Sequence, residues 1–201
     1  MGRALGAAIR ALFGLDKPVT NPKDYQAQDL FRYYREDHAL DRWPRNLLQE
    51  FKNLGLRVLN VGCGRAESVL ADSTWIGVDF NPDLRRIWEV VGVERQCHVA
   101  DVQMIPSLFK EDEFDVSYSC DFLEHVNPRL ALETIQAMKH AAPAGFHIID
   151  HAVQSGFRGV NGDNLHPSAH LPGSTWLAYV DEEGAKFEEF GPRHWLLSWG
   201  M

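Results

Sequence analysis

The stretch Leu56–Glu67 reads LRVLNVGCGRAE, in which an apolar run leads directly into two glycines separated by one residue. A short apolar run closed by a turn predicts a buried strand. Glycine lacks a Cβ, so Gly62 and Gly64 permit a tight turn and a close approach of a ligand to the backbone. We also expect free N–H groups in this turn to meet polar atoms of that ligand. The stretch therefore predicts a strand whose carboxyl end carries a binding loop.

Strand and helix patterns alternate from this stretch to residue 150. Alternation of this kind predicts βαβ units and a mainly parallel sheet. The further strands are expected at WIGVD (75–79), QCHVA (96–100), FDVSYS (114–119) and GFHIID (145–150). The runs KFEEF (186–190) and HWLLSW (194–199) predict a closing antiparallel hairpin. The predicted fold class is α/β: a Rossmann-like, doubly wound, mainly parallel seven-stranded sheet with a C-terminal antiparallel hairpin.

Two helices between these strands begin with an Asn–Pro pair, in NPDLRRIWEVV (81–91) and NPRLALETIQAMKHA (127–141). Asparagine is a favoured N-cap, and proline is favoured at the first helical position. The sequence therefore predicts N-caps at Asn81 and Asn127. Later in the chain, Ser174 is expected to cap a short helix that carries Trp176.

The charge balance limits the class of partner. Lys and Arg together number 20 and Asp and Glu 28, which gives a formal net charge of −8. An acidic chain gains little from counterion release, so we expect no binding to duplex nucleic acid. Cys63, Cys97 and Cys120 form no CxxC pair, which favours free thiols in a reducing, cytoplasmic setting. No apolar run is long enough for a transmembrane segment.

The N-terminal stretch MGRALGAAIRALFGLDKP places apolar residues at helical spacing, with Arg3 and Arg10 apart from them. This pattern predicts an amphipathic helix. Packing on the domain or on a partner is the simpler interpretation, and lying on a membrane surface is the alternative. The sequence does not decide between them.

Acidic residues follow most of the predicted strands, at Asp79, Asp101, Asp121 and Asp150. Ligands of open parallel sheets bind outside the carboxyl ends of the strands. An acid at the end of the second strand suits a bidentate hydrogen bond to ribose hydroxyls, and Asp101 can accept from an exocyclic amine. Part of this pattern reflects the ordinary preference of Asp for turns. Together with the glycines, the acids predict a nucleoside site.

The segments VLNVGCGRAE, GVDFNPD, ADVQMIP and FDVSYSCDFLEHVNP resemble the ordered motifs of class I S-adenosylmethionine-dependent methyltransferases. The resemblance covers about residues 55–150 and implies S-adenosylmethionine as cofactor, with S-adenosylhomocysteine as product. It implies that the glycine loop borders the methionine portion, Asp79 the ribose, and Asp101 with Val102 the adenine. The cofactor-binding residues carried over in this way are Asn60, Gly62, Cys63, Gly64, Asp79, Phe80, Asp101, Val102, Ser119 and Cys120.

This chain departs from the family pattern at two positions. Asn60 stands where an acid is usual, and an amide holds an ammonium group less strongly than a carboxylate does. Ala66 stands where a third glycine is usual. An NAD-dependent enzyme is the rival interpretation, but Glu67 then falls at the third glycine of the dinucleotide fingerprint, where it would place a carboxylate near the pyrophosphate.

The candidate catalytic residues are Asp121 and His125, in the run CDFLEHV. A methyl acceptor with an O–H or N–H group must lose a proton, and histidine accepts protons near neutral pH. A structural role for His125 in the turn is the alternative. A third interpretation is a divalent metal held by Asp121, Glu124 and His125, which resembles the ligand run of metal-assisted small-RNA 2′-O-methyltransferases and of some ubiquinone-pathway O-methyltransferases. We expect no metal as the main interpretation.

The long segment after residue 150 is rich in Gly, Pro and His, and long loops of this kind are often binding elements. The candidate acceptor-binding residues are His151, His166, His170, Trp176 and, from the N-terminal part, Tyr34. Ordinary core packing is the alternative for the aromatic residues.

The sequence thus predicts a single methyltransferase domain over residues 1–201, with a helical N-terminal cap (1–53), a Rossmann-like core (54–201) and an acceptor-side loop (151–175). Its expected activity is methyl transfer from S-adenosylmethionine to an oxygen or nitrogen of a small molecule or saccharide. Metal-assisted 2′-O- or catechol-type methylation is one alternative, and a weakly active cofactor-binding partner subunit is another. The sequence leaves the oligomeric state open.

Overall fold

The computed structural model describes residues 48, 50–64, 74–150, 166–190 and 194–201. Within these residues one seven-stranded sheet has the order β3-β2-β1-β4-β5-β7-β6. The strands are β1 (Val58–Val61), β2 (Trp75–Asp79), β3 (Cys97–Val99), β4 (Val116–Cys120), β5 (Gly145–Asp150), β6 (Lys186–Glu189) and β7 (His194–Trp199). Each lies within one of the predicted runs or extends it by one residue, and the predicted α/β class is confirmed.

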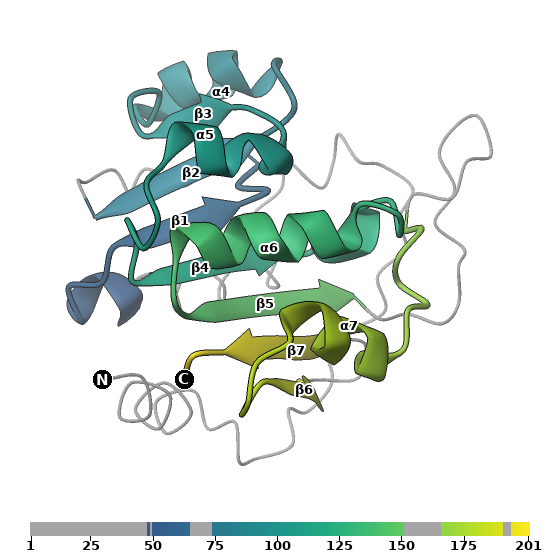
Figure 1. Ribbon diagram of the computed structural model, residues 1–201. Helices are drawn as coiled ribbons and strands as arrows, with labels where there is room; N and C mark the ends of the chain where they lie inside the picture. The colour runs from purple at the N-terminus through teal and green to yellow at the C-terminus, as the bar shows by residue number, and fades with distance from the viewer. Residues whose placement is uncertain (1–47, 49, 65–73, 151–165, 191–193) are drawn as a thin grey trace.

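Strands β1 to β5 pair in parallel, whereas β7 pairs antiparallel with both β5 and β6. The closing antiparallel hairpin is therefore confirmed. The arrowheads of the parallel strands point to one edge of the sheet in Figure 1, and β7 points the other way. Because Asp150 pairs with His194, the beginning of β7 lies beside the end of β5 at this carboxyl edge.

Helices pack on both faces of the sheet. In Figure 1, α5 (Ile105–Leu108), α6 (Ala131–Ala141) and α7 (Gly173–Val180) lie on the same face. Strand residues such as Leu59 and Ile149 join these helices in one buried cluster. The alternate residues, such as Phe146 and Ile148, join α4 (Leu84–Val91) in the other cluster. This period of two is expected for strands buried on both faces.

The helices begin later than the Asn–Pro pairs predict. The N-cap of α4 is Asp83, and the N-cap of α6 is Leu130. The side chain of Asn81 instead accepts a hydrogen bond from the Asp83 N–H, and Asn127 accepts one from the Arg129 N–H, both at 3.0 Å. Each asparagine forms an Asx turn that precedes its helix. Helix α7 begins at Gly173 with Pro172 as N-cap, so Ser174 lies inside the helix.

Most of the predicted N-terminal cap lies outside the described residues. Leu48 and Phe51 are helical and buried in the cluster on the α4 face. None of the helices in the described part of the chain is both long and apolar enough to cross a bilayer. The domain division and the cytoplasmic setting stay predictions.

Candidate functional site

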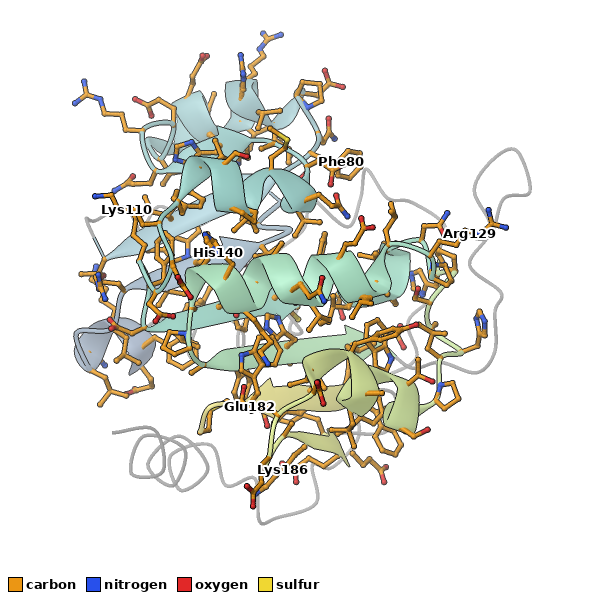
Figure 2. The ribbon with its side chains drawn as sticks, viewed as in Figure 1. Phe80, Lys110, Arg129, His140, Glu182 and Lys186 are labelled. Carbon is orange, nitrogen blue, oxygen red and sulfur yellow. The ribbon has the colours of Figure 1, made fainter. Side chains whose placement is uncertain are left out.

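The carboxyl edge brings the predicted binding residues into one row. Following the strand order, Asp101 stands after β3, Asp79 at the end of β2, and Gly62 and Gly64 after β1. We call these strand ends, together with Phe80, the nucleoside half. Phe80 lies at this edge in Figure 2, and its side chain is 73% exposed. The row then continues into a second half, after β4, β5 and the start of β7.

The glycine loop of the nucleoside half is fixed by its own hydrogen bonds. Gly62 and Gly64 have φ values of 69° and 52°, in the left-handed region that favours glycine. The N–H groups of Gly62 and Cys63 donate to the Val78 carbonyl at 2.8 and 3.2 Å. The Gly64 N–H donates to Asp79 Oδ2 at 3.0 Å. The expectation of free amides in this loop was therefore wrong.

Asp79 organises this half of the site. Its Oδ1 accepts a hydrogen bond from the Asn81 N–H at 3.0 Å, while Oδ2 holds Gly64. Trp88 in α4 donates its indole N–H to the Gly64 carbonyl at 2.8 Å. The loop after β1 is thus joined to β2 and α4, and each Asp79 oxygen keeps a lone pair for a further donor.

Gly62 also makes room for a protein side chain. A Cβ at this position would lie 2.4 Å from the ring of Phe122, which follows β4. The sequence predicted that the absence of a side chain at Gly62 leaves space for a ligand. In the structure the Phe122 ring occupies this space. Phe122 therefore marks the boundary between the nucleoside half and the second half of the edge.

The nucleoside half fits the adenosine portion of S-adenosylmethionine. Asp79 offers two half-buried acceptor oxygens, as ribose hydroxyls require. Asp101 is exposed, and its Oδ1 accepts a long hydrogen bond of 3.4 Å from the Gln103 N–H. Beside them, the exposed Phe80 and Met104, the latter 49% exposed, supply apolar surface for a base. Val102 is nearly buried, at 8% exposure, in the short helix η3 (Val102–Met104).

The other predicted cofactor residues have side chains engaged inside the protein or buried. Cys63 packs against Gly77, with its Sγ 2.7 Å from where a Cβ would stand. Asn60 is buried in β1, and Cys120 is half-buried at the end of β4. Burial raises the pKa of both thiols, of Cys63 and of Cys120. Neither thiol therefore has the character of a reactive thiolate.

Ser119 belongs to a buried polar network. Its hydroxyl lies 2.9 Å from His147 Nδ1, and the Ser117 hydroxyl lies 3.2 Å from His147 Nε2. The imidazole stacks on Trp199 with ring centroids 4.7 Å apart. Burial lowers the pKa of His147 to about 3, so the ring is neutral at physiological pH. The Ser119 side chain is therefore committed to the sheet interior.

The second half of the edge, which we call the acceptor half, gathers titratable groups from three strands. Asp121 follows β4 with a left-handed φ of 51°. Its Oδ1 lies 3.5 Å from Nε2 of His194, the first residue of β7. Asp150 ends β5 beside His194 and is 9% exposed. The acceptor half thus consists of Asp121, Glu124, His125, Asp150 and His194.

Glu124 lies beneath this surface in the short helix η4 (Leu123–His125) and is fully buried. Its Oε1 accepts the Asp150 N–H at 3.2 Å, whereas its Oε2 has no hydrogen-bond partner among the described residues. Burial first, and then the charges of Asp121 and Asp150, raise the pKa of Glu124 well above the usual range.

His125 is exposed on the same short helix. Its ring packs edge-to-face on His166, with centroids 4.4 Å apart. The turn is fastened to the segment after residue 165, because the Ser168 N–H donates to the Glu124 carbonyl at 3.0 Å and the Ser168 hydroxyl donates to the Val126 carbonyl. The structure therefore brings His125 and His166 together at the acceptor half.

The remaining predicted acceptor residues divide into three groups. His170 is exposed, near His166 in the chain. Trp176 is fully buried in the cluster under α6, so its ring belongs to the core, as the alternative interpretation held. Tyr34 and His151 lie outside the described residues.

The proposed metal ligands do not form a ligand set. No group of three or more His, Cys, Asp or Glu side chains with suitable geometry occurs in the described part of the chain. Within the triad suggested by the sequence, Asp121 faces His194 and Glu124 holds the Asp150 amide.

Comparison with known proteins agrees with this geometry. Residues 59–149 match the family model of a methyltransferase domain. A methyltransferase from Archaeoglobus fulgidus, described as dependent on S-adenosylmethionine, superposes with a TM-score of 0.61 at 19% identity, covering 86% of this chain and 99% of the other. The match over residues 59–149 and the shared fold agree with the predicted S-adenosylmethionine-dependent methyltransferase.

Two further structures contain the reaction product S-adenosylhomocysteine. The N-terminal domain of EvdMO1 has a TM-score of 0.54 at 15% identity, over 96% of this chain and 94% of the other. The 1,6-didemethyltoxoflavin-N1-methyltransferase of Burkholderia thailandensis, which also holds 1,6-didemethyltoxoflavin, has a TM-score of 0.55 at 16% identity, over 90% and 92%. At these identities the likeness establishes the fold. None of the curated proteins matches the sequence.

Sequence reasoning missed two residues of the site. His194 was assigned only to a strand, although an antiparallel last strand must begin at the edge where the parallel strands end. Because His194 is the first residue of the HWLLSW run, the sequence alone could have placed it at this edge. The contact of Phe122 with Gly62 had no comparable signal, because it depends on how two neighbouring strand ends are oriented.

Proposed function

We propose that this methyltransferase acts on an oxygen or nitrogen atom of a small molecule or saccharide. The observation that carries the proposal is the division of the carboxyl edge at Phe122. Nucleoside-binding acids lie on one side, and a set of carboxyl and imidazole groups suited to binding and deprotonating an acceptor lies on the other. Bound in the nucleoside half, S-adenosylmethionine supplies an electrophilic methyl carbon on a sulfonium ion.

The residues proposed to hold the cofactor are those of the nucleoside half. The Asp79 oxygens accept from the ribose hydroxyls, and Asp101 accepts from the adenine amine. Phe80 covers the base with its exposed ring. The backbone after β1 lies beside the methionine portion of the cofactor. Its N–H groups remain hydrogen-bonded to Val78 and Asp79.

His125 and Asp121 are proposed to act on the acceptor. His125 is exposed on a turn that Ser168 fastens in place, so its ring is held at a defined position. Histidine is the side chain best suited to accept a proton from an O–H or N–H group at neutral pH. His166, in contact with His125, and the neighbouring His170 are proposed to line the acceptor site.

Two observations support a small acceptor. The formal net charge of −8 disfavours a polyanionic nucleic acid. The fold is shared with an enzyme whose structure holds 1,6-didemethyltoxoflavin, a small heterocycle. The acceptor class itself stays a proposal.

The test is a methylation screen with S-adenosylmethionine labelled in its methyl group. The purified chain is incubated with a cell extract separated into small-molecule, saccharide, protein and nucleic-acid fractions. We expect label in the small-molecule or saccharide fraction, and none when Asp79→Ala protein replaces the wild type. Label that appears only in protein or nucleic acid would contradict the proposal.

A further inference from the structure

Three carboxyl groups meet in the acceptor half, and we call Asp121, Glu124 and Asp150 the carboxyl cluster. They come from the residue after β4, from η4 and from the end of β5. The Asp150 backbone N–H donates to Glu124 Oε1 at 3.2 Å, so the Glu124 carboxyl is directed at the end of β5. Asp121, whose side chain is 34% exposed, is the member that solvent reaches most readily.

Glu124 adds an observation that does not depend on the clustering. Its side chain is fully buried, and its Oε2 accepts no hydrogen bond from the part of the chain that the structure describes. Leaving a buried acceptor without a donor is costly, by about 1–3 kcal/mol and more for a charged group. A ligand that brings positive charge close to the cluster would offset part of this cost.

The charges that act on Glu124 are those of Asp121 and Asp150, and both raise its pKa after the larger effect of burial. The same negative surroundings, from Asp121 and Glu124, act on the Cys120 thiol of β4. The imidazole that contacts the cluster is His194 from β7, beside Asp121, and the other imidazoles of the acceptor half are His125 and its neighbour His166. Each imidazole carries a charge only when protonated.

We propose that the carboxyl cluster binds the ammonium group of a protonated amine, and that the methyl acceptor is therefore an amine. His125 takes the proton of the bound ammonium group, because only the neutral nitrogen has a lone pair that can bond to the methyl carbon. The inference rests on the proposed function and narrows it from oxygen or nitrogen to nitrogen. Asp121 meets the ammonium group at the surface, and Glu124 behind it balances the charge. A neutral alcohol of the same shape offers one O–H donor and no charge, so it binds more weakly.

Binding of a cation has a measurable consequence for Glu124. A nearby positive charge favours the ionised carboxylate, so a bound ammonium group lowers the pKa of Glu124 and releases a proton at any pH where Glu124 is protonated. Ammonium binding is therefore coupled to proton release, and the affinity increases as pH rises. The increase ends at the pH where the unbound ammonium ion loses its own proton. No such coupling is expected for an alcohol.

The experiment is isothermal titration of the full chain saturated with S-adenosylhomocysteine. The probes are methylammonium, butylammonium and benzylammonium, each paired with its alcohol, in buffers of different ionisation enthalpy. We expect at least one ammonium probe to bind about tenfold to hundredfold more tightly than its alcohol, as a charge-assisted hydrogen bond allows. The measured heat should also depend on the buffer, with the sign of proton release.

Three variants make the result specific. Glu124→Gln keeps the shape of the side chain and removes its charge, and Asp121→Asn does the same at the exposed member of the cluster. Both should lose most of the preference for ammonium, and Glu124→Gln should also lose the proton release. Glu133→Gln, an exposed carboxyl in α6, is the matched control and should bind as the wild type does.

Equal affinity for ammonium probes and alcohols, in protein that binds S-adenosylhomocysteine, would overturn this inference and leave the proposed function intact. An ammonium preference that survives both cluster variants would overturn it as well. Tight binding of Mn²⁺ alone, lost in Glu124→Gln, would identify a metal site instead. Failure to bind S-adenosylhomocysteine would count against the proposed function itself.

Discussion

The two halves of the carboxyl edge differ in how completely their polar groups are satisfied. In the nucleoside half, both oxygens of Asp79 hold backbone amides, and Gly64 is bonded through its N–H and its carbonyl. In the acceptor half, Glu124 is buried with one oxygen that has no partner within the described ranges, and Asp121 has a left-handed backbone. The polar groups of the nucleoside half are therefore held in place before any ligand binds. The acceptor half instead contains carboxyl groups whose negative charge a ligand can balance.

This difference separates what each half contributes. A prearranged set of acceptors binds a rigid nucleoside at little entropic cost. Carboxyl and imidazole groups that perturb one another are typical of sites where protons move. Substitutions on the two sides of Phe122 should therefore affect different measured quantities, and the following predictions run from the largest expected effect to the smallest.

The largest effect is expected for Asp79→Ala. The variant removes the acceptor proposed for the ribose and the support of the Gly64 and Asn81 amides. Since each charge-assisted hydrogen bond contributes about 1.5–3 kcal/mol, affinity for S-adenosylhomocysteine should fall by about hundredfold or more. Isothermal titration measures it, with Asp83→Ala as control, because the exposed Asp83 makes no side-chain cap bond. Equal losses in both variants would contradict the role of Asp79.

On the other side of Phe122, His125→Ala should slow turnover and leave cofactor affinity unchanged. Removal of a general base lowers the rate by about hundredfold or more. Steady-state kinetics on the identified acceptor and titration with S-adenosylhomocysteine separate the two quantities. His140→Ala is the matched control, since His140 lies in α6 and Figure 2 shows it away from the carboxyl edge. Unchanged turnover in His125→Ala would contradict the role of His125 as general base and would favour a structural role.

The boundary between the halves can be tested with glycine substitutions. Gly62→Ala and Gly55→Ala both place a Cβ on a left-handed residue, with φ values of 69° and 68°. The added Cβ meets the Phe122 ring at 2.4 Å in the first variant and nothing within 4 Å in the second. Overpacking should therefore lower the free energy of unfolding of Gly62→Ala by about 1–3 kcal/mol more than that of Gly55→Ala. Urea denaturation measures both values. Equal destabilisation would show that Phe122 moves away freely.

The smallest effect, when it is measured between pH 7 and pH 6, concerns the buried His147, whose pKa is lowered to about 3 in the folded chain. The unfolded chain binds a proton at this residue below about pH 6.5, and the folded chain does not until about pH 3. The free energy of unfolding should therefore fall as pH drops through this window, by at most about 1.4 kcal/mol per pH unit from this residue. His147→Gln should remove this component, so an identical acid dependence in wild type and variant would contradict it.

The parallel part of the sheet was predictable because its strands are largely apolar runs followed by turn residues, whereas β6 (KFEE) was expected only as the partner of the HWLLSW strand. The helix starts were misplaced because asparagine before proline can cap a helix or form an Asx turn, and Asn81 and Asn127 do the latter. Local sequence cannot decide between these geometries, since the choice depends on where the helix must meet the sheet.

The candidate site was predictable where it depends on strand order. Acids at strand ends meet at one edge whatever the side-chain details, so Asp79, Asp101 and Asp121 lie in one row. Contacts across strands were not predictable: Phe122 fills the space beside Gly62, and Ser119 turns to His147. Trp176 shows the same limit, because an aromatic residue at helical spacing suits a core as well as a binding site.

The central claim is that a nucleoside occupies the β3-β2-β1 side of Phe122 and the acceptor occupies the β4-β5-β7 side. A crystal structure with S-adenosylhomocysteine tests it most directly. We expect the ribose hydroxyls on Asp79, the adenine beside Asp101 and Phe80, and the sulfur next to the Gly62–Phe122 contact, facing the acceptor half. A ribose bound among Asp121, Asp150 and His194, or Asp79 without contact to the ligand, would contradict the account.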